Sequence, residues 1–324
     1  MIKIAFFDAK EYDRESFEAM KSEDVLIKYF ETHLHKDTAL LADGYDVVCV
    51  FVNDVVDKSV IDILVKEKVK MIALRCAGYN NVDVEYARGK IKLVRVPAYS
   101  PYAVAEHAMA LLLTLVRRIH KAYIRTRDFN FSLKGLTGFD LHGKTVGVIG
   151  TGKIGKVFID ICNGFGMKVI AYDKFPSTDE GIKYVPLSEI FEKSDIISLH
   201  CPLNDETWHI VNEASIESMK KGVIIINTSR GALVESEALL EGIKNRKIGA
   251  ACLDVYEEEA DVFYNDFSGH IFSDDVLTRL ISMPNVIVTS HQAFLTKEAL
   301  MNIADTTYQN IRQIYDNNSS INEI

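Results

Sequence analysis

The chain has 324 residues, which is long for a single hydrophobic core and favours two domains. Its apolar content of 48% is that of a globular protein, and its net charge of −9 argues against a nucleic-acid or anionic-membrane surface, because such surfaces need clustered Lys and Arg. The first residues lack the pattern of a signal peptide, and the longest apolar stretch, 108–116, is far shorter than the ~20 residues of a membrane span. We therefore expect a soluble, cytoplasmic protein that binds neither nucleic acid nor a membrane.

Cysteine and histidine spacing argues against disulfides and metal sites. The five cysteines show no C-x-x-C spacing and stand mostly in apolar segments, so we predict reduced, buried packing residues. His33 and His35 have no matching ligands nearby, and the chain contains no H-E-x-x-H motif. We expect no metal.

Before residue 100, strand-like segments alternate with amphipathic helical segments such as Glu11–Lys21 and Lys58–Lys68. Alternation of this kind predicts a parallel sheet with helices on its faces. The strand-like segments are apolar and span residues 2–7, 25–30, 46–52, 71–75 and 92–96.

A long helix is predicted to follow. Pro101 suits its first position with Ser100 as N-cap, and we expect the helix to run to about Thr126. The basic cluster at 117–121 is interpreted as a solvated helix end, where cations are favoured by the helix dipole.

The most informative segment is 145–173, which reads as strand, glycine turn, helix and second strand. The apolar strand Thr145–Ile149 leads directly into Gly150-Thr151-Gly152-Lys153-Ile154-Gly155, a complete G-x-G-x-x-G. A helical stretch from about Lys153 to Phe165 follows, and a second strand begins at Lys168 and ends at the acid Asp173. This order predicts a dinucleotide-binding unit.

The chemistry of that unit explains its residue types. Gly150 permits a tight turn, Gly152 lets the backbone approach a pyrophosphate, and Gly155 lets helix and strand pack closely. The carboxylate of Asp173 is predicted to accept hydrogen bonds from ribose hydroxyls and to repel a 2′-phosphate, which favours NAD over NADP. Lys174, directly after the acid, weakens that preference slightly.

Further strands are predicted at 196–199, 223–227, 249–253 and 286–289, and a last amphipathic helix from Lys297 to about Tyr315. We expect this helix to cross back to the first domain. The predicted fold class is α/β, with two Rossmann-like or flavodoxin-like parallel-sheet domains and an active-site cleft between them. Residues 1–99 and 297–324 form the predicted substrate domain, and 100–296 form the predicted NAD-binding domain.

Charged side chains follow three successive strands. Arg230 comes after the strand at 223–227, the acids Glu257, Glu258 and Glu259 come after the next strand, and His291 comes after the last. Hydride transfer to a 2-keto acid needs an anchor for the carboxylate, a proton donor, and a group that keeps the donor charged. Arg, His and Glu supply these functions, but spacing does not choose among the three glutamates.

Several motifs closely resemble the D-2-hydroxyacid dehydrogenase family, and within it the fermentative D-lactate dehydrogenase branch. The resemblance covers essentially the whole chain. It is carried by the segments 51–54, 73–83, 96–101, 199–203 and 227–231, by Asp254-Val255-Tyr256-Glu257 with Glu259, and by His291-Gln292-Ala293-Phe294-Leu295-Thr296.

The resemblance implies roles for individual residues. It implies that Arg230 binds and polarises the substrate, that Glu259 pairs with the histidine, and that His291 is the general acid/base. The substrate carboxylate is assigned to the backbone of Ala77 and Gly78 with Tyr99. The contact with the substrate's side chain is assigned to Phe51. The alternative is that Phe51 is an ordinary aromatic residue of the core. Cofactor contacts are assigned to the glycine turn and to Asp173, Cys201, Pro202, Thr228, Ser229, Asp254 and His291.

The predicted function is that of an NAD-dependent D-lactate dehydrogenase acting on pyruvate, with the product hand implied by resemblance alone. Two alternatives stay open: a dehydrogenase for larger 2-keto acids or hydroxypyruvate, and an NAD-responsive co-repressor that binds without catalysis. We also expect a homo-oligomer, either a dimer or a tetramer.

Overall fold

The computed structural model describes residues 1–178, 181–259 and 262–324. The chain forms two compact units: unit 1 comprises Met1–Ser100 and Phe294–Ile324, and unit 2 comprises Pro101–Ala293. The return to unit 1 thus comes three residues earlier than the sequence boundary at 296/297. The reason is Phe294, whose ring lies 5.8 Å from that of Phe51 and 6.3 Å from that of Tyr99.

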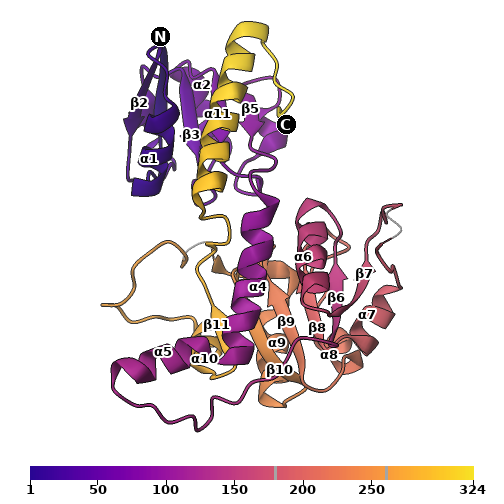
Figure 1. Ribbon diagram of the computed structural model, residues 1–324. Coiled ribbons are helices and arrows are strands. Elements are labelled where there is room, and N and C mark those ends of the chain that lie inside the picture. Colours follow the sequence, from indigo (N-terminus) through magenta and orange to yellow (C-terminus); the bar gives the residue numbers. More distant parts are fainter. Residues whose placement is uncertain (179–180, 260–261) are drawn as a thin grey trace. The chain divides into compact units, whose positions relative to one another are not determined.

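The described part of unit 1 is built on a five-stranded parallel sheet in the order β2-β1-β3-β4-β5 (Figure 1). This order is that of flavodoxin-like folds. Each strand lies within one or two residues of its predicted ends: β1 Ile2–Phe6, β2 Val25–Tyr29, β3 Val47–Val50, β4 Met71–Leu74 and β5 Lys92–Arg95.

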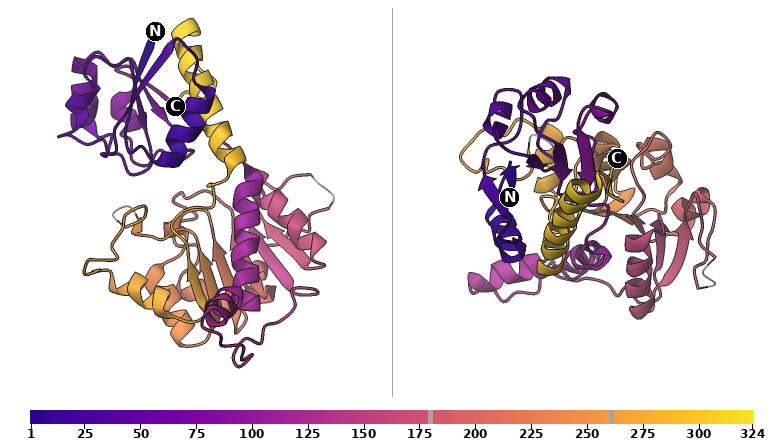
Figure 2. Two further views of the ribbon diagram at one scale, coloured as in Figure 1. Left: turned by 60° about the vertical axis from the view of Figure 1, so that its left-hand side comes forward. Right: turned by 90° about the horizontal axis from the view of Figure 1, so that it is seen from above.

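The last helix of the chain belongs to unit 1, as predicted. α11 packs beside α1, and the Tyr308 hydroxyl of α11 donates a hydrogen bond to the Phe17 carbonyl of α1 over 2.9 Å (Figure 2). The helical elements of this unit are α1 Glu11–Met20, the 3-10 helix η1 Ala39–Ala42, α2 Lys58–Lys66, α3 Val84–Ala87 and α11 Lys297–Asn317.

A buried charge cluster, which the sequence did not predict, lies at the carboxyl ends of β1, β3 and β4. Arg75 is 2% exposed; its Nη2 donates to the Asp8 carbonyl over 2.8 Å, and its Nε lies 3.4 Å from Asp13. Asp54 accepts the N–H groups of Leu34 and Phe51, each over 2.6 Å. Burial raises the pKa of Asp54 to about 7, although the Arg75 charge and these hydrogen bonds oppose the rise.

In unit 2 the described residues form a six-stranded parallel sheet in the order β11-β10-β9-β8-β6-β7. A bridge from Ala171 to Tyr184 adds a short parallel pairing beside β7, which completes the strand order of a dinucleotide-binding fold. The strands are β6 Thr145–Ile149, β7 Lys168–Tyr172, β8 Ile196–Leu199, β9 Val223–Asn227, β10 Ile248–Leu253 and β11 Val286–Val288.

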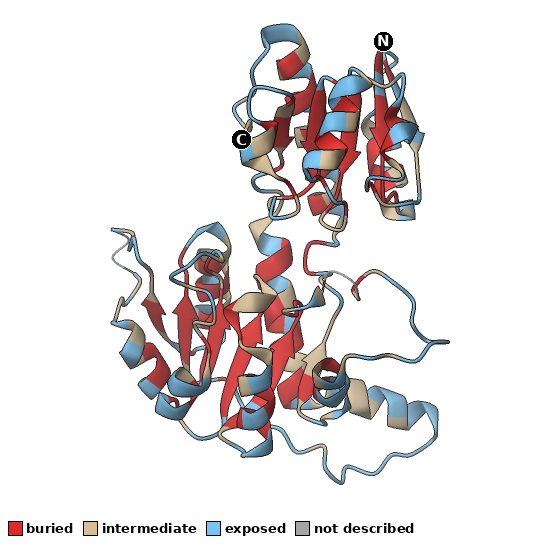
Figure 3. Ribbon diagram, turned by 180° about the vertical axis from the view of Figure 1, so that it is seen from behind, coloured by how far each residue is buried: buried red, intermediate tan, exposed pale blue. Residues whose placement is uncertain are grey.

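Two apolar cores cover the two faces of this sheet, whose central strands β6, β8 and β9 are buried over nearly their whole length (Figure 3). In β9, Ile224 and Ile226 face the core that contains α4 and α6, and Ile225 faces the core that contains α7 to α10. The helical elements are α4 Pro101–Arg117, α5 Ile119–Arg127, α6 Lys153–Gly164, α7 Leu187–Lys193, α8 Glu213–Ser218, η2 Gly231–Leu233, α9 Ser236–Lys244 and α10 Asp275–Ser282.

The prediction of one helix from Pro101 to about Thr126 is wrong. Arg118 has a φ of 55°, in the left-handed region, and it separates α4 from α5. The Arg118 guanidinium and the Lys121 ammonium both donate to the Pro284 carbonyl, over 3.1 and 2.7 Å, which holds the bend in place. No helix in the described ranges is long and apolar enough to cross a membrane.

Candidate active site

The turn after β6 has the geometry of a phosphate-binding loop. Gly150 has a φ of 94°, and a Cβ there would lie 2.5 Å from the Cys201 nitrogen. A Cβ on Gly155 would lie 2.0 Å from the Gly150 carbonyl oxygen, so only glycine lets α6 approach the turn. By contrast, a Cβ on Gly152 would meet nothing within 4 Å. The backbone at Gly152, directly before α6, is therefore open to close approach, and the first N–H groups of a helix have no partners within it, so this turn suits a pyrophosphate.

Asp173 follows β7, and its carboxylate accepts hydrogen bonds from the same turn. Oδ2 accepts the Thr151 N–H over 2.6 Å and the Thr151 hydroxyl over 2.9 Å, while Oδ1 accepts the Phe175 N–H over 2.9 Å. Burial opposes ionisation, but these hydrogen bonds outweigh it and lower the pKa of Asp173. The turn thus carries an ionised acid where the sequence predicts the ribose partner.

Arg230 lies in a tight turn after β9. Asn227 Nδ2 donates to the Arg230 carbonyl over 2.8 Å, and the Ser229 hydroxyl donates to the Cys201 carbonyl over 2.8 Å. Arg230 Nη1 donates to the Ser229 carbonyl over 2.7 Å, which fixes one arm of the guanidinium. Thr228 is 6% exposed, and its hydroxyl has no hydrogen-bond partner among the described residues. A buried hydroxyl without a partner is costly, so Thr228 fits a ligand contact.

His291 follows β11 and is held by Asp254, which follows the neighbouring strand β10. The His291 N–H donates to the Asp254 carbonyl over 2.7 Å, and the fully buried Asp254 carboxylate accepts the N–H groups of Gln292 and Ala293 over 3.0 and 2.8 Å. His291 has a φ of 51°, which these bonds stabilise. Asp254 therefore sets the course of the backbone that carries the histidine.

The His291 side chain pairs with Glu259. Nδ1 lies 2.8 Å from Glu259 Oε1, and the other carboxylate oxygen accepts the Tyr256 N–H over 2.8 Å. The His291 and Glu259 side chains are 19% and 23% exposed. The carboxylate orients the ring and favours a proton on Nδ1, which leaves Nε2 to exchange a proton with a substrate. Because β9, β10 and β11 are neighbours in the sheet, Arg230, Glu259 and His291 come from three adjacent strand ends (Figure 1).

Unit 1 carries the residues assigned to the substrate carboxylate and side chain. The carbonyls of Ala77 and Gly78 accept hydrogen bonds from Arg95 Nη1 over 2.7 Å and from Cys76 Sγ over 3.2 Å, which fixes this loop. The Tyr99 carbonyl accepts from Asn302 over 2.7 Å. Phe51 is 8% exposed, with its ring 4.8 Å from the Arg75 guanidinium carbon.

Comparison with known proteins places the chain in a family. The family model described as "D-isomer specific 2-hydroxyacid dehydrogenase, NAD binding domain" matches residues 109–293. The chain is 50% identical to D-lactate dehydrogenase of Escherichia coli strain K12 over 328 residues, and the match covers 100% of both chains. The chain belongs to the D-isomer specific 2-hydroxyacid dehydrogenase family.

Solved structures of related dehydrogenases agree. The apo structure of D-lactate dehydrogenase from Escherichia coli matches this dehydrogenase with a TM-score of 0.92 at 48% identity, over 100% of each chain. The NAD complexed form of the D-isomer specific 2-hydroxyacid dehydrogenase from Lactobacillus delbrueckii ssp. bulgaricus matches with a TM-score of 0.83 at 30% identity, over 99% of each chain. This dehydrogenase is an NAD-dependent oxidoreductase, and the open space at Gly152 and the buried Thr228 hydroxyl fit that cofactor.

Two histidine pairs of this dehydrogenase were not identified from the sequence. His107 Nε2, on α4, lies 3.2 Å from Asp254 Oδ1. His209 Nε2 lies 2.5 Å from Glu257 Oε1, which distinguishes Glu257 from Glu259. Their partners are far along the chain, so spacing carries no signal for either pair. Burial opposes ionisation of Asp254, but the His107, Thr289 and Ala293 hydrogen bonds outweigh it and lower the pKa of its carboxyl group.

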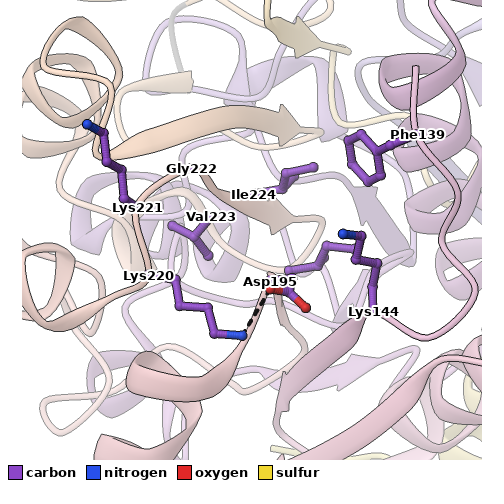
Figure 4. Close-up of a pocket in the computed structure, with 9 residues that line it drawn as sticks. Phe139, Lys144, Asp195, Lys220, Lys221, Gly222, Val223 and Ile224 are labelled. Carbon is purple, nitrogen blue, oxygen red and sulfur yellow. Dashed lines mark hydrogen bonds and ion pairs between the residues drawn. The ribbon is translucent and has the colours of Figure 1, made fainter. Parts of the chain in front are cut away.

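A pocket of about 230 Å³ lies at the amino-terminal ends of β6, β8 and β9, on the opposite side of the unit 2 sheet from the glycine turn (Figure 4). It is lined by Lys144, Lys220, Lys221 and Asp195, and Lys220 Nζ lies 2.9 Å from Asp195. Its residues precede the strands, whereas the glycine turn, Arg230 and His291 follow them. Among the residues whose placement is described, no group of His, Cys, Asp or Glu could hold a metal ion.

Proposed function

We propose that this dehydrogenase is an NAD-dependent D-lactate dehydrogenase that interconverts pyruvate and D-lactate. The observation that carries the proposal is the 2.8 Å His291–Glu259 pair on the strand ends next to Arg230. The 50% identity to an enzyme named D-lactate dehydrogenase supports the choice of substrate and of product hand.

Arg230 anchors the substrate in this proposal. Its guanidinium binds the pyruvate carboxylate with parallel hydrogen bonds and draws electron density from the adjacent carbonyl group. The hydrogen bond from Nη1 to the Ser229 carbonyl restricts the side chain before substrate arrives, which reduces the entropy lost on binding.

His291 transfers the proton. NADH, when bound, supplies a hydride to the carbonyl carbon. The Nε2–H of the His291 imidazolium gives its proton to the carbonyl oxygen, so that the alkoxide never accumulates. Glu259 orients the ring through Nδ1, and in lactate oxidation the neutral imidazole takes the proton back.

Residues of unit 1 contribute to the same proposal. The N–H groups of the fixed Ala77–Gly78 loop and the Tyr99 side chain bind the substrate carboxylate, and Phe51 borders its methyl group. A bulky ring at that place favours pyruvate over larger 2-keto acids.

The proposal includes a cytoplasmic location and a homo-oligomer. All five cysteines are buried and free, which is consistent with a reducing compartment. Light scattering coupled to size-exclusion chromatography distinguishes a dimer or tetramer from a monomer.

The direct test is NADH oxidation with pyruvate, phenylpyruvate, 2-ketoisocaproate and hydroxypyruvate. We expect the highest kcat/KM with pyruvate. A higher kcat/KM with another keto acid would change the substrate assignment, and no turnover with any of them would overturn the enzymatic proposal.

Arg230→Lys keeps the charge but loses the planar fork, so it should raise the KM for pyruvate sharply.

A further inference from the structure

Lys174 sits next to Asp173, where an ammonium group would attract the 2′-phosphate of NADPH. In the structure its Nζ lies 2.5 and 2.6 Å from the two carboxylate oxygens of Glu206. Lys174 follows β7 and Glu206 lies in the segment after β8, and β6 lies between these two strands. The ion pair therefore joins the two segments that flank the glycine turn after β6.

Hydroxyl groups that could donate hydrogen bonds to a phosphate lie around Asp173. The Thr151 hydroxyl lies 2.9 Å from the Tyr184 hydroxyl, which accepts the Ser177 N–H over 3.2 Å. Phosphate oxygens prefer such donors together with a cation. Two carboxylates oppose that chemistry here: Asp173 within the hydroxyl cluster, and Glu206 on the ammonium group.

We propose that Glu206 is a second determinant of cofactor choice: by holding Lys174 in an ion pair, it keeps the ammonium group from offsetting the charge of Asp173. The NAD preference then rests on both acids. The inference concerns the cofactor site alone and does not depend on which keto acid is reduced.

The expected size of the effect is modest because the ion pair is exposed. The Lys174 and Glu206 side chains are 56% and 62% exposed, and pairs of this kind contribute little to stability. A 2′-phosphate carries close to two negative charges, however, so releasing one nearby ammonium group should strengthen its binding by about three- to tenfold at low salt.

The test is calorimetric titration with ADP-ribose and with its 2′-phosphorylated form, without any keto acid. Variants are Glu206→Gln, Asp173→Ser, the two combined, and Asp205→Asn as the control, because Asp205 is the exposed acid next to Glu206. We expect the ratio of the two Kd values, phosphorylated over unphosphorylated, to fall about three- to tenfold in Glu206→Gln and further in the combined variant. A ratio within twofold of wild type, or an equal fall in Asp205→Asn, would overturn the proposal. Binding of ADP-ribose to the wild type separately checks the cofactor site.

A second background tests whether Glu206 acts through Lys174. In Lys174→Met, Glu206→Gln removes only an exposed charge that salt screens, so its effect on the Kd ratio should shrink to less than twofold. An undiminished effect in that background would show that Glu206 acts by itself and would contradict the proposed role of the ion pair.

Discussion

The arrangement of His291 depends on two acids with different tasks. The Asp254 carboxylate and carbonyl fix the backbone on which the ring is mounted, and Glu259 fixes the ring itself over 2.8 Å. A φ of 51° is strained for a histidine, and these hydrogen bonds stabilise it. Such support is what a histidine that acts as the acid/base group needs.

Replacing His291 tests that role. Since positioned acid–base groups typically contribute ~10²–10⁴-fold, His291→Gln should lower kcat for pyruvate reduction on that scale. Affinity for NADH, measured by fluorescence titration, should change little. The matched control is the exposed His270→Gln, and activity of His291→Gln within fivefold of wild type would remove the residue from the mechanism.

Replacing Glu259 tests whether its carboxylate positions the His291 ring. Glu259→Gln removes a charged acceptor from Nδ1, and hydrogen bonds to charged groups contribute ~1.5–3 kcal/mol, so kcat for pyruvate reduction should fall by about tenfold or more. The control is the exposed neighbour Glu258→Gln, whose kcat should match that of wild type. A kcat of Glu259→Gln within twofold of wild type would count against the pair.

Phe51 either contacts the substrate methyl group or packs in the core, and one substitution distinguishes these two roles. It packs against Phe294 and Arg75 and is 8% exposed, so the structure alone is compatible with a core role. If Phe51 borders the substrate methyl group, Phe51→Leu should move relative kcat/KM toward phenylpyruvate or 2-ketoisocaproate by roughly 10–200-fold. An equal loss of kcat/KM on all substrates, together with a lowered Tm, would show that Phe51 is a core residue.

At the scale of elements, the β6–α6–β7 unit was the most predictable part of the chain. Its strands begin at Thr145 and Lys168 as predicted, because glycines, an apolar strand and a terminal acid all point to one local structure. The α4–α5 bend was not predictable in the same way. Its left-handed residue is Arg118 rather than a glycine, and the bonds to the Pro284 carbonyl that stabilise it come from far along the chain.

The same unit gives a prediction about cofactor choice. The sequence predicts that Asp173 accepts hydrogen bonds from the ribose hydroxyls. Asp173→Ser would then remove a charged acceptor, and hydrogen bonds to charged groups contribute ~1.5–3 kcal/mol. The preference for NADH over NADPH, measured as a ratio of kcat/KM values, should narrow by about tenfold or more. Equal use of both cofactors by the wild type would contradict the assignment of Asp173.

At the scale of the whole molecule, the sequence predicted both sheets and the strand ends that carry Arg230, Glu259 and His291. It did not predict contacts between side chains that are distant in sequence. The buried Arg75 cluster and the His107 and His209 pairs depend on how strands and helices pack, and neither periodicity nor spacing encodes that. The choice of Glu259 among three acids came from resemblance, and the geometry separates it from Glu257.

The hand of the product tests the proposed function. Wild-type enzyme is incubated with pyruvate and excess NADH, and the lactate formed is resolved by enantioselective chromatography. We expect D-lactate alone, in an amount that matches the NADH consumed. L-lactate, a racemic mixture, or NADH consumption without lactate would contradict it.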